Sequence, residues 1–527
     1  MEASMSIKQV SKDTEVDERL AALSTNANAI RAIASAVEGT LGPKGLDTML
    51  VDQFGDVVIT NDGVTILEMM EVNHPAARMM INTAKAQQDE IGDGTTTASI
   101  MAGTLVTEGL EQIKRGVPVT RVIEGIKVGI KIAIQYFGEN AVAIEKLDNP
   151  VLKEVSRIAG RGNDDIAELV FDAANMIGKE KLLDTNFKLA DCIFAQHGAE
   201  NQLVKGCIIT KERVSSDMPR ELMDCNVLFI DDALEPEQLD EEALGNEAGF
   251  NRFISLKEEF QENLKKLPKL GIGLVLVDRG IHDLAEEFFI DTGIIAVQRV
   301  SHKELKKAAE STGARMIKRT GLKKNLKELK SYLGRTDKVY EDEYLQQIRI
   351  LGGAGKPMAT ILVGAATEEV VGERERIAKD AAAALQAAIK GGIVPGGGSI
   401  ELAAASFLEN NREQVRGMAV YGINCVVEAL KKPFSQIVFN AGFNPLEKQG
   451  DVQGVQKQEN NIGYAIDCDS GQTVDMKELG VIDPVLVKIY ALRAAGEIAE
   501  AILRIDTIIK KRPDKVADNR AKDEFEF

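Results

Sequence analysis

The stretch GDGTTTASIMAGTLVTEGLEQI, residues 92–113, gives the clearest link between fold and function in this chain. Its second part is apolar at helical spacing, so it predicts a buried helix that begins near residue 95. Glycines before a helix let a ligand approach the amides of the first turn, where the helix dipole favours an anion. We expect Asp93 to cap this helix, or to serve as an oxygen ligand for Mg²⁺ among phosphates. A capped helix without a ligand would explain the same residues.

Outward from this stretch, helical patterns occupy both ends of the chain. Apolar residues recur every three or four positions over 15–39, Ala-rich helical segments run to about residue 140, and similar segments return after about residue 390. Between about 205 and 355, strand-like runs such as NVLFI and GIGLVLVD alternate with helical stretches. That alternation is typical of an α/β unit. The sequence therefore predicts an α/β domain inserted into a helical one.

Length, composition and charge limit the class of protein. A chain of 527 residues predicts about three domains, and its 64 Lys and Arg against 82 Asp and Glu give a net charge of −18. Because phosphate neutralisation needs a basic face, this charge disfavours nucleic-acid binding. No apolar run reaches the length of a membrane span, and the polar start resembles no signal peptide. We expect a cytoplasmic protein with no membrane partner.

The cysteines and histidines indicate no metal or disulfide framework. The five cysteines are scattered and form no CxxC pair, and the four histidines form no HExxH motif. We expect the thiols to be small buried hydrophobic groups. They are Cys192, Cys207, Cys225, Cys425 and Cys468.

Two further loops and two carboxylates can carry chemistry. TLGPKG at 40–45 follows a helix and GGIVPGGGSIE at 391–401 precedes one, and each also fits an ordinary turn or hinge. Asp62 follows the strand VVIT in the turn Asn61-Asp62-Gly63, which is a sufficient explanation for an aspartate. Asp380 lies at the margin of an apolar helical stripe, where a carboxylate needs a structural or catalytic partner.

A helical stripe in the middle of the chain has two interpretations. Apolar residues from 250 to 267 share one face, and Lys and Glu cover the other. This is typical of an amphipathic helix docked on its domain, or of an exposed stripe that captures another protein. The residues that would contact the other protein are Phe250, Phe253, Ile254 and Phe260.

Taken together, these stretches resemble the group II chaperonins of the archaeal thermosome type. The matching motifs are GPKGLDTMLVD, GDVVITNDGVTIL, HPAARMM, GDGTTTA, GGIVPGGGSIE and VIDPVLVK. The resemblance extends from about residue 15 to 512 and includes the archaeal-type chaperonins of some bacteria. It implies a multidomain α and α/β fold, with a mostly helical equatorial domain, a small intermediate domain and an inserted α/β apical domain with a helical protrusion.

The resemblance also implies domain boundaries and partners. The equatorial domain would comprise 1–146 and 397–527, the intermediate domain 147–209 and 358–396, and the apical domain 210–357. Such subunits form stacked rings, here expected to be eightfold, that enclose unfolded polypeptides under a built-in lid without a separate lid protein. The implied activity is ATP hydrolysis with Mg²⁺ as the cofactor. The same resemblance implies K⁺ as a further cofactor.

Site residues follow from the motifs. The implied nucleotide ligands are Leu41, Gly42, Pro43, Gly94, Thr95, Thr96, Thr97, Arg161, Gly397 and Asp483. Asp93 would bind Mg²⁺, and Asp62 and Asp380 would orient and activate the attacking water. Arg161 stands where the family usually has a Lys that senses the γ-phosphate, and Arg differs from Lys in its hydrogen-bonding geometry.

Two other functions compete with this one. A ring-forming holdase or scaffold would bind unfolded protein without productive hydrolysis, but it would not need Asp62, Asp93 and Asp380 together. A small-molecule kinase or transferase has little support, because the sequence contains no motif for an acceptor substrate. The charged end KKRPDKVADNRAKDEFEF, residues 510–527, is expected to be a solvated tail.

Overall fold

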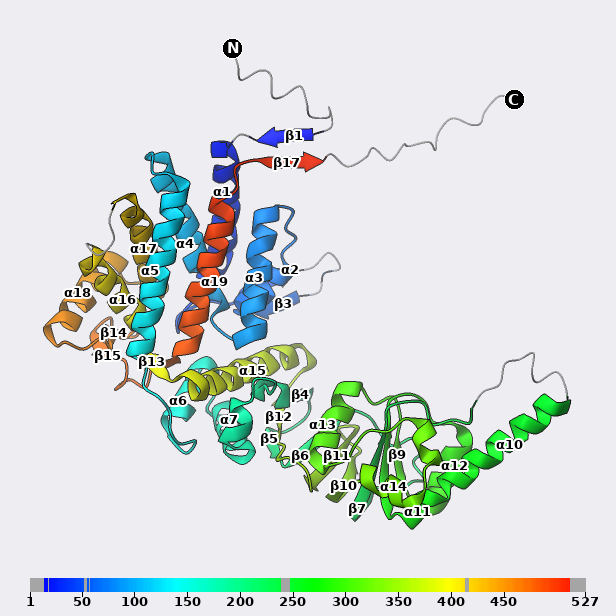
Figure 1. Ribbon diagram of the computed structural model, residues 1–527. Coiled ribbons are helices and arrows are strands. Elements are labelled where there is room, and N and C mark those ends of the chain that lie inside the picture. Colours follow the sequence, from blue (N-terminus) through cyan, green and yellow to red (C-terminus); the bar gives the residue numbers. More distant parts are fainter. Residues whose placement is uncertain are drawn as a thin grey trace, which may run out of the picture. The chain divides into compact units, whose positions relative to one another are not determined.

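The chain leaves one structural unit at residue 143 and returns to it at residue 391. In the computed structural model, one unit comprises Met1–Ala143 with Gly391–Phe527, and the other comprises Ile144–Lys390 (Figure 1). The structure describes residues 14–17, 19–51, 55, 57–237, 247–412 and 417–511. The tail expected at 510–527 lies outside the described residues from residue 512 onward.

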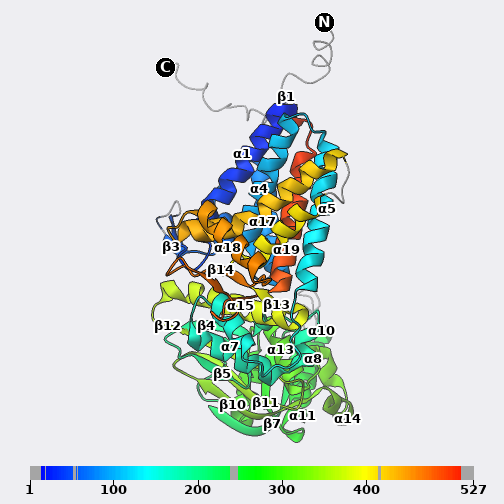
Figure 2. The ribbon, with the colours of Figure 1, turned by 90° about the vertical axis from the view of Figure 1, so that its left-hand side faces the viewer.

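Helices from both ends of the chain build the first unit. Its helices are α1 (Arg19–Glu38), α2 (Gly63–Met69), α3 (Pro75–Ile91), α4 (Thr95–Lys114), α5 (Val119–Glu139), α16 (Ser399–Asn410), α17 (Val420–Asn440), α18 (Pro445–Gln458) and α19 (Val485–Leu503). Helix α4 packs against α1, α17 and α19, and Figure 2 shows these helices side by side. The helix predicted to follow GDGTTTA is therefore the centre of this core, with Met101 and Leu105 fully buried.

Glycines allow helices α5 and α17 to approach closely. A Cβ atom on Gly125 would lie 1.9 Å from the Ala419 carbonyl oxygen and 2.7 Å from the Cα of Gly422. A Cβ atom on Gly422 would lie 2.1 Å from the Val122 carbonyl oxygen. Because no side chain fits between two backbones at these distances, the crossing requires glycine on both helices.

Short strand pairs connect distant segments of the first unit. The pairs are β1 (Thr14–Asp17) with β17 (Ile508–Lys511), β2 (Thr48–Val51) with β3 (Val57–Thr60), β13 (Ile393–Pro395) with β16 (Ile482–Pro484), and β14 (Tyr464–Ile466) with β15 (Thr473–Asp475), all antiparallel. Val142 also bridges to Ile393. The segments that leave and re-enter the first unit are thus hydrogen-bonded to each other.

A six-stranded sheet lies at the centre of two apolar cores in the second unit. Its order is β6 (Gly206–Ile209), β11 (Gln347–Gly353), β10 (Gly334–Asp342), β7 (Glu221–Ile230), β8 (Ile272–Val277) and β9 (Ile295–Val297). The strands β7, β8 and β9 run parallel, and the other pairs are antiparallel. Along β7, Leu228 and Ile230 enter one core and Val227 and Phe229 enter another. Both faces of the sheet are therefore covered.

Helices cover the two faces of this sheet. One core includes residues of α10 (Glu247–Leu264), α11 (Lys266–Lys269), α12 (Asp283–Thr292), η3 (Arg319–Lys323) and α14 (Leu326–Leu329), and the other includes residues of α13 (His302–Thr312). The short helix η4 (Lys330–Tyr332) precedes β10. The predicted alternation of strands and helices is confirmed.

A three-stranded sheet with its own helices completes the second unit. Strands β4 (Ile193–His197), β12 (Thr360–Ala365) and β5 (Gln202–Val204) lie in that order. The accompanying helices are α6 (Val151–Ala159), α7 (Asp164–Ile177), α8 (Lys179–Leu183), η2 (Leu189–Cys192) and α15 (Glu368–Gly391). This sheet and these helices come from the segments before and after the six-stranded sheet.

Four of the five cysteines are buried, as predicted, and Cys468 is half-buried. Burial raises the pKa of Cys192 and of Cys207 to about 11, and that of Cys425 to about 12. At neutral pH these thiols are protonated and unreactive. Across the described ranges, no helix is both long and apolar enough to cross a membrane.

The close helix crossing gives a stability test. We expect Gly125→Ala to lower the free energy of unfolding by at least about 2 kcal/mol, because the added methyl group forces α5 and α17 apart. Denaturant unfolding of the full chain measures this change. Gly138→Ala is the control in the same helix, since nothing lies within 4 Å of its added Cβ. It should leave stability within about 1 kcal/mol or raise it, and equal losses in both variants would contradict the close-crossing argument.

Candidate functional site

The loop before α4 presents backbone amides rather than a capped helix end. Gly94 occupies the N-cap position with φ +80°, and no side chain caps this helix. Asp93 Oδ1 instead accepts a hydrogen bond from the adjacent Gly94 amide at 2.5 Å. The expectation that Asp93 caps the helix is therefore wrong, because Gly94 takes the left-handed conformation that the turn needs. The amides of Thr95, Thr96 and Thr97 have no intrahelical acceptor and remain for a ligand.

The preceding helix holds this loop in place. Gln87 Nε2, in α3, donates a hydrogen bond to the Asp93 carbonyl oxygen at 2.9 Å, and Gln88 Nε2 donates to the Gly92 carbonyl oxygen at 3.2 Å. Gln87 is buried. These contacts fix the backbone of residues 92–94, so the orientation of Asp93 is set before any ligand arrives.

Asp62 lies beside the start of α4. Its Oδ2 accepts hydrogen bonds from the Thr65 amide at 2.9 Å and from Thr65 Oγ1 at 2.6 Å, so Asp62 caps helix α2. The turn expected at Asn61-Asp62-Gly63 is thus the start of a helix. A Cβ atom on Gly63 would lie 2.4 Å from Thr96 Oγ1. The carboxylate is therefore anchored next to the threonines that open α4.

Two glycine-containing loops lie against the C-terminal half of the chain. In the first, Asn440 Nδ2 donates a hydrogen bond to the Leu41 carbonyl oxygen at 2.8 Å. In this loop, Gly42 and Pro43 are exposed. In the second, Gly397 has φ +65°, and a Cβ atom on it would lie 3.0 Å from Met476 Sδ. The first loop is thus exposed at Gly42 and Pro43, whereas residues 396–398 of the second are buried except for the half-buried Gly397.

The first turn of α19 connects these elements. A Cβ atom on Gly94 would lie 2.7 Å from Val487 Cγ1, and a Cβ atom on Gly396 would lie 3.0 Å from the carboxyl carbon of Asp483. Asp483 pairs across the β-ladder with Val394. The structure therefore brings together the residues predicted at 62, 93–97, 397 and 483, and ties the loop at 41–43 to the end of α17.

The other two predicted residues belong to the second unit. Arg161 follows α6 with φ +56°, and its guanidinium forms an ion pair with Glu373 of α15. Asp380 lies seven residues after Glu373 on α15 and is half-buried, next to the fully buried Ala381. Its predicted place at the margin of the apolar stripe agrees with this burial.

Helix α10 divides the predicted apolar stripe into two parts. Phe260 and Leu264 are buried against the six-stranded sheet, whereas Phe250 and Ile254 are 56% and 40% exposed. The docked-helix interpretation therefore holds for the second half of the helix, and the first half leaves apolar side chains exposed; capture of another protein stays a prediction. Phe253 is half-buried and carries the Lys257 ammonium over its ring, 4.6 Å from the centroid.

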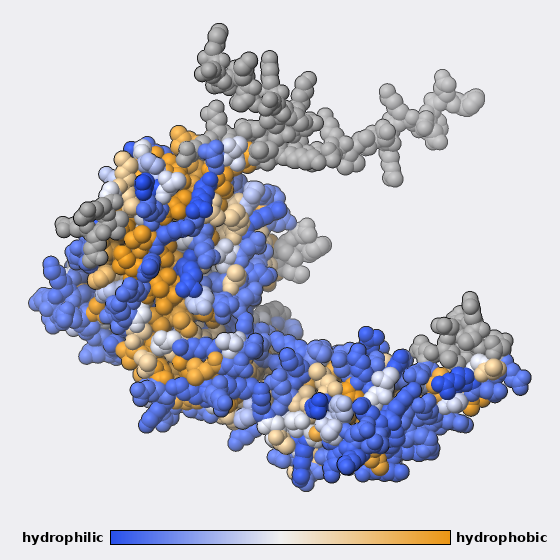
Figure 3. Space-filling view, in the orientation of Figure 1, coloured by the Kyte–Doolittle hydropathy of each residue, from blue (hydrophilic) through white to orange (hydrophobic). Residues whose placement is uncertain are grey.

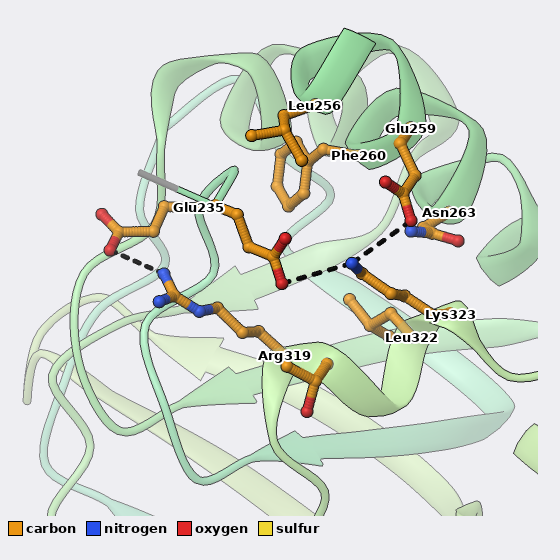
Figure 4. A pocket seen from close by; sticks show the side chains of 10 residues that line it. Glu235, Leu256, Glu259, Phe260, Asn263, Arg319, Leu322 and Lys323 are labelled. Carbon is orange, nitrogen blue, oxygen red and sulfur yellow. Dashed lines mark hydrogen bonds and ion pairs between the residues drawn. The ribbon is translucent and has the colours of Figure 1, made fainter. Parts of the chain in front are cut away.

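A pocket lies where the docked half of α10 meets η3. Figure 4 shows Leu256 and Phe260 above Leu322, with ion pairs along the rim. Lys323 Nζ lies 3.2 Å from Glu237 Oε1 and 3.3 Å from Glu259 Oε1, while Arg319 Nη1 lies 2.8 Å from Glu235 Oε1. Lys323 thus links the loop before α10 to the helix itself.

Comparisons with known proteins identify the family of this chain. The sequence profile described as the TCP-1/cpn60 chaperonin family matches residues 33–513. The chain belongs to the TCP-1/cpn60 chaperonin family. A thermosome subunit of Methanopyrus kandleri is 34% identical over 92% of this chain and 91% of its own length. One of Pyrococcus abyssi is 35% identical over 92% of this chain and 90% of its own length.

A solved chaperonin structure shares the fold. A group III chaperonin in the open state superposes with a TM-score of 0.85 and 46% sequence identity, over 93% of this chain and 99% of that chain. This identity is higher than those to the two thermosome subunits. The predicted thermosome-type resemblance, the multidomain fold class and the function of an ATP-dependent chaperonin are confirmed. Chaperonins of this family are ATPase-type chaperones, and the family implies nucleotide binding and oligomeric assembly.

Sequence reasoning missed several residues that support this chaperonin site. They are Gln87, Glu401, Asn440, Val487 and Lys488. The sequence could have indicated two of them, Glu401 and Lys488. Each is the single charged residue in an otherwise apolar helical run, SIELAAASFL and PVLVKIYAL, and a charge in a buried helix needs a partner. The side-chain amides of Gln87 and Asn440 donate to backbone carbonyl oxygens, Gln87 to that of Asp93 and Asn440 to that of Leu41, and no sequence pattern indicates such contacts.

The glycine before α4 gives a binding test. We expect Gly94→Ala to weaken nucleotide binding at least about tenfold, because its Cβ would collide with Val487 and displace the first turn of α4. Titration with a fluorescent adenine nucleotide measures the affinity. Gly116→Ala is the matched control: Gly116 also has positive φ, just beyond the other end of α4, but its Cβ would meet open space. The control should lose about 1 kcal/mol of stability and keep its affinity; equal affinities in both variants would contradict the role of Gly94.

Proposed function

We propose that this chain is one subunit of a ring-shaped chaperonin that hydrolyses ATP and uses the resulting domain movement to enclose and fold unfolded polypeptides. The observation that carries this proposal is that the Asp62 turn and the loops at 92–94 and 396–398 lie close to the start of α4 or α19, while the loop at 41–43 is held by Asn440 at the end of α17. A core helix whose N-terminal amides face glycine-rich loops is suited to a polyphosphate. The folding function follows from family membership.

The residues of α4 would hold the phosphates. The Thr95, Thr96 and Thr97 amides and hydroxyls offer donors at the positive end of the helix dipole. Asp93 is the carboxylate fixed beside them, and one carboxylate together with phosphate oxygens and water is a usual Mg²⁺ environment. In the described part of the chain, no group of three or more His, Cys, Asp or Glu side chains could hold a metal ion. Bound Mg²⁺ would neutralise phosphate charge; the K⁺ requirement stays a prediction.

Other predicted residues would surround the rest of the nucleotide. Leu41, Gly42 and Pro43 would line one side, and Gly397 and Asp483 would lie against the base and ribose. Asp62, held by its bonds to Thr65, would orient the attacking water from within this unit. Asp380 would activate that water, and Arg161 would respond to the γ-phosphate. Because Asp380 and Arg161 belong to the other unit, hydrolysis would require domain closure.

The domain roles follow from the same assignment. We assign the equatorial role to 1–146 and 397–527, the intermediate role to 147–209 and 358–396, and the apical role to 210–357. The exposed half of α10, with Phe250 and Ile254, would act as the built-in lid or contact clients. No separate lid protein is expected, and the cytoplasmic location stays a prediction.

An exposed apolar hairpin supports self-association. Met49 pairs with Ile59 and Val51 pairs with Val57 across β2 and β3, so all four share one face. Their exposures are 63%, 52%, 60% and 52%. Apolar surface also gathers over the helices of the first unit (Figure 3). Such surface in a water-exposed position is typical of a subunit contact, and a closed ring, here eightfold, would cover it.

Assembly can be tested on this hairpin. We expect Ile59→Asp to convert a large assembly into subunits, because a charge would have to be buried in the contact. Light scattering of the purified full chain with ATP and Mg²⁺ measures the mass. Met223→Asp is the control, since Met223 is 63% exposed in the second unit. A monomeric wild-type protein, or an intact Ile59→Asp assembly, would contradict the hairpin contact.

Catalysis can be tested on Asp380. We expect Asp380→Asn to bind ATP within about twofold of the wild type and to lose at least about 100-fold in turnover, because the amide cannot accept a proton from water. Phosphate release and nucleotide titration measure the two quantities. Glu375→Gln, on the same helix and ion-paired with Lys379, is the control and should keep its turnover. Normal phosphate release by Asp380→Asn would remove Asp380 from the catalytic set.

A refolding assay separates this function from a holdase. A denatured enzyme should regain activity with ATP and not with a non-hydrolysable analogue if hydrolysis drives the folding cycle. Equal yields with both nucleotides would favour a holdase or scaffold. The Asp380→Asn variant should behave with ATP as the wild type does with the analogue.

A further inference from the structure

A buried ammonium group joins two carboxylates at the start of α19. Lys488 Nζ lies 2.7 Å from Glu401 Oε1 and 2.7 Å from Asp483 Oδ2. The Glu401 side chain is fully buried, the Lys488 side chain is 11% exposed and the Asp483 side chain is 22% exposed. The three residues come from α16, α19 and β16, so the cluster links three elements around the glycine-rich turn 396–398.

The two carboxylates of this cluster depend on the Lys488 ammonium. Burial by itself would lower the pKa of Lys488, but the attraction of Asp483 and Glu401 outweighs it and raises that pKa above its usual value. One ammonium between two carboxylates leaves one net negative charge. Since Asp483 is the most exposed member, this charge faces the turn at 396–398 rather than the core. Removing Lys488 alone would strand Glu401 as an uncompensated buried charge.

The geometry sets the direction of the Asp483 carboxylate. Lys488 contacts Oδ2, and both this oxygen and the carboxyl carbon lie 3.0 Å from where a Cβ on Gly396 would be. A side chain held at one oxygen cannot rotate freely, so the orientation of the second oxygen is fixed as well. The neighbouring Val487 contacts Gly94 of the phosphate loop, so the same helical turn also sets the distance between Asp483 and α4.

We propose that Lys488, backed by Glu401, is a positioning residue for the ribose of the bound nucleotide: it fixes Asp483 so that the free carboxylate oxygen accepts a hydrogen bond from a ribose hydroxyl. This inference rests on the proposed nucleotide site. It goes beyond the motif resemblance, which assigns no role to Lys488 or Glu401. The cluster would thus make the site selective for ribonucleotides, although Lys488 and Glu401 themselves do not contact the ligand.

The test compares ribose recognition in matched variants of the full chain. The double variant Glu401→Gln with Lys488→Met removes the inner pair and leaves the net charge of the cluster unchanged. We measure dissociation constants for ATP, 2′-deoxy-ATP and 3′-deoxy-ATP. The wild type should bind ATP at least about tenfold more tightly than one of the two deoxy analogues. The ratio of the analogue's dissociation constant to that of ATP should fall close to one in the double variant, mainly because ATP binds more weakly. Asp483→Asn should lower this ratio too.

A second cluster supplies the control. Lys431 lies 2.7 Å from Glu409 and 3.0 Å from Glu428, with its side chain 14% exposed. Glu409→Gln with Lys431→Met makes the same chemical change away from the candidate site, and it should keep the full ribose ratio even if stability falls. Glu401→Gln alone is the milder variant, with an intermediate ratio expected if the double variant does not fold.

The outcomes distinguish this inference from the function it rests on. A wild-type protein that binds no adenine nucleotide would overturn the proposed site itself. A wild type that binds ATP and both deoxy analogues equally would overturn the ribose contact. A double variant that retains the wild-type ratio while losing stability would show that Lys488 and Glu401 are structural only. Loss of the ratio in the double variant, but not in the Lys431 control, supports the proposal.

Discussion

Helix α4 lies between α1, α17 and α19 and buries most of its side chains, including Met101 and Leu105. A helix enclosed in this way cannot rotate or slide without opening cavities or forcing contacts in a close-packed core. Its N-terminal amides therefore have fixed positions, and the site needs little reorganisation when an anion binds. Since α1 and α17 come from opposite ends of the chain, the site depends on the closure of the whole first unit.

Residues in the first turn of α19 contact several of the loops around the site. Leu486 contacts Gly391, where the chain re-enters the unit, Val487 contacts Gly94, and Lys488 binds Glu401 and Asp483. Glycine at 391 and 94 is required because a Cβ there would lie 2.4 Å and 2.7 Å from these side chains. These loops therefore share one helical turn as their common contact. Gly391 is also the last residue of α15, the helix that carries Asp380.

Much of this could be predicted from the sequence, for identifiable reasons. Apolar spacing located α4 and α19, the alternation of strands and helices located the six-stranded sheet, and specific motifs located the residues at 62, 93–97, 397 and 483. The capping of α4 was mispredicted because Asp and Gly both suit that position, and only the backbone conformation shows that Gly94 takes it. The Lys488 cluster was missed because Glu401 and Asp483 lie 87 and 5 residues from Lys488, and spacing reports contacts only within one element.

Helix α10 shows how one amphipathic pattern can serve two purposes. The buried Phe260 and Leu264 side chains each contribute about 1.5–3 kcal/mol to docking. The ion pairs of Lys323 lie at a half-exposed rim, where such pairs contribute about 0–1 kcal/mol. Docking energy is therefore concentrated in the last two turns of the helix. The first turns are free of this constraint, so Phe250 and Ile254 can present apolar surface to another molecule while the helix stays attached to its domain.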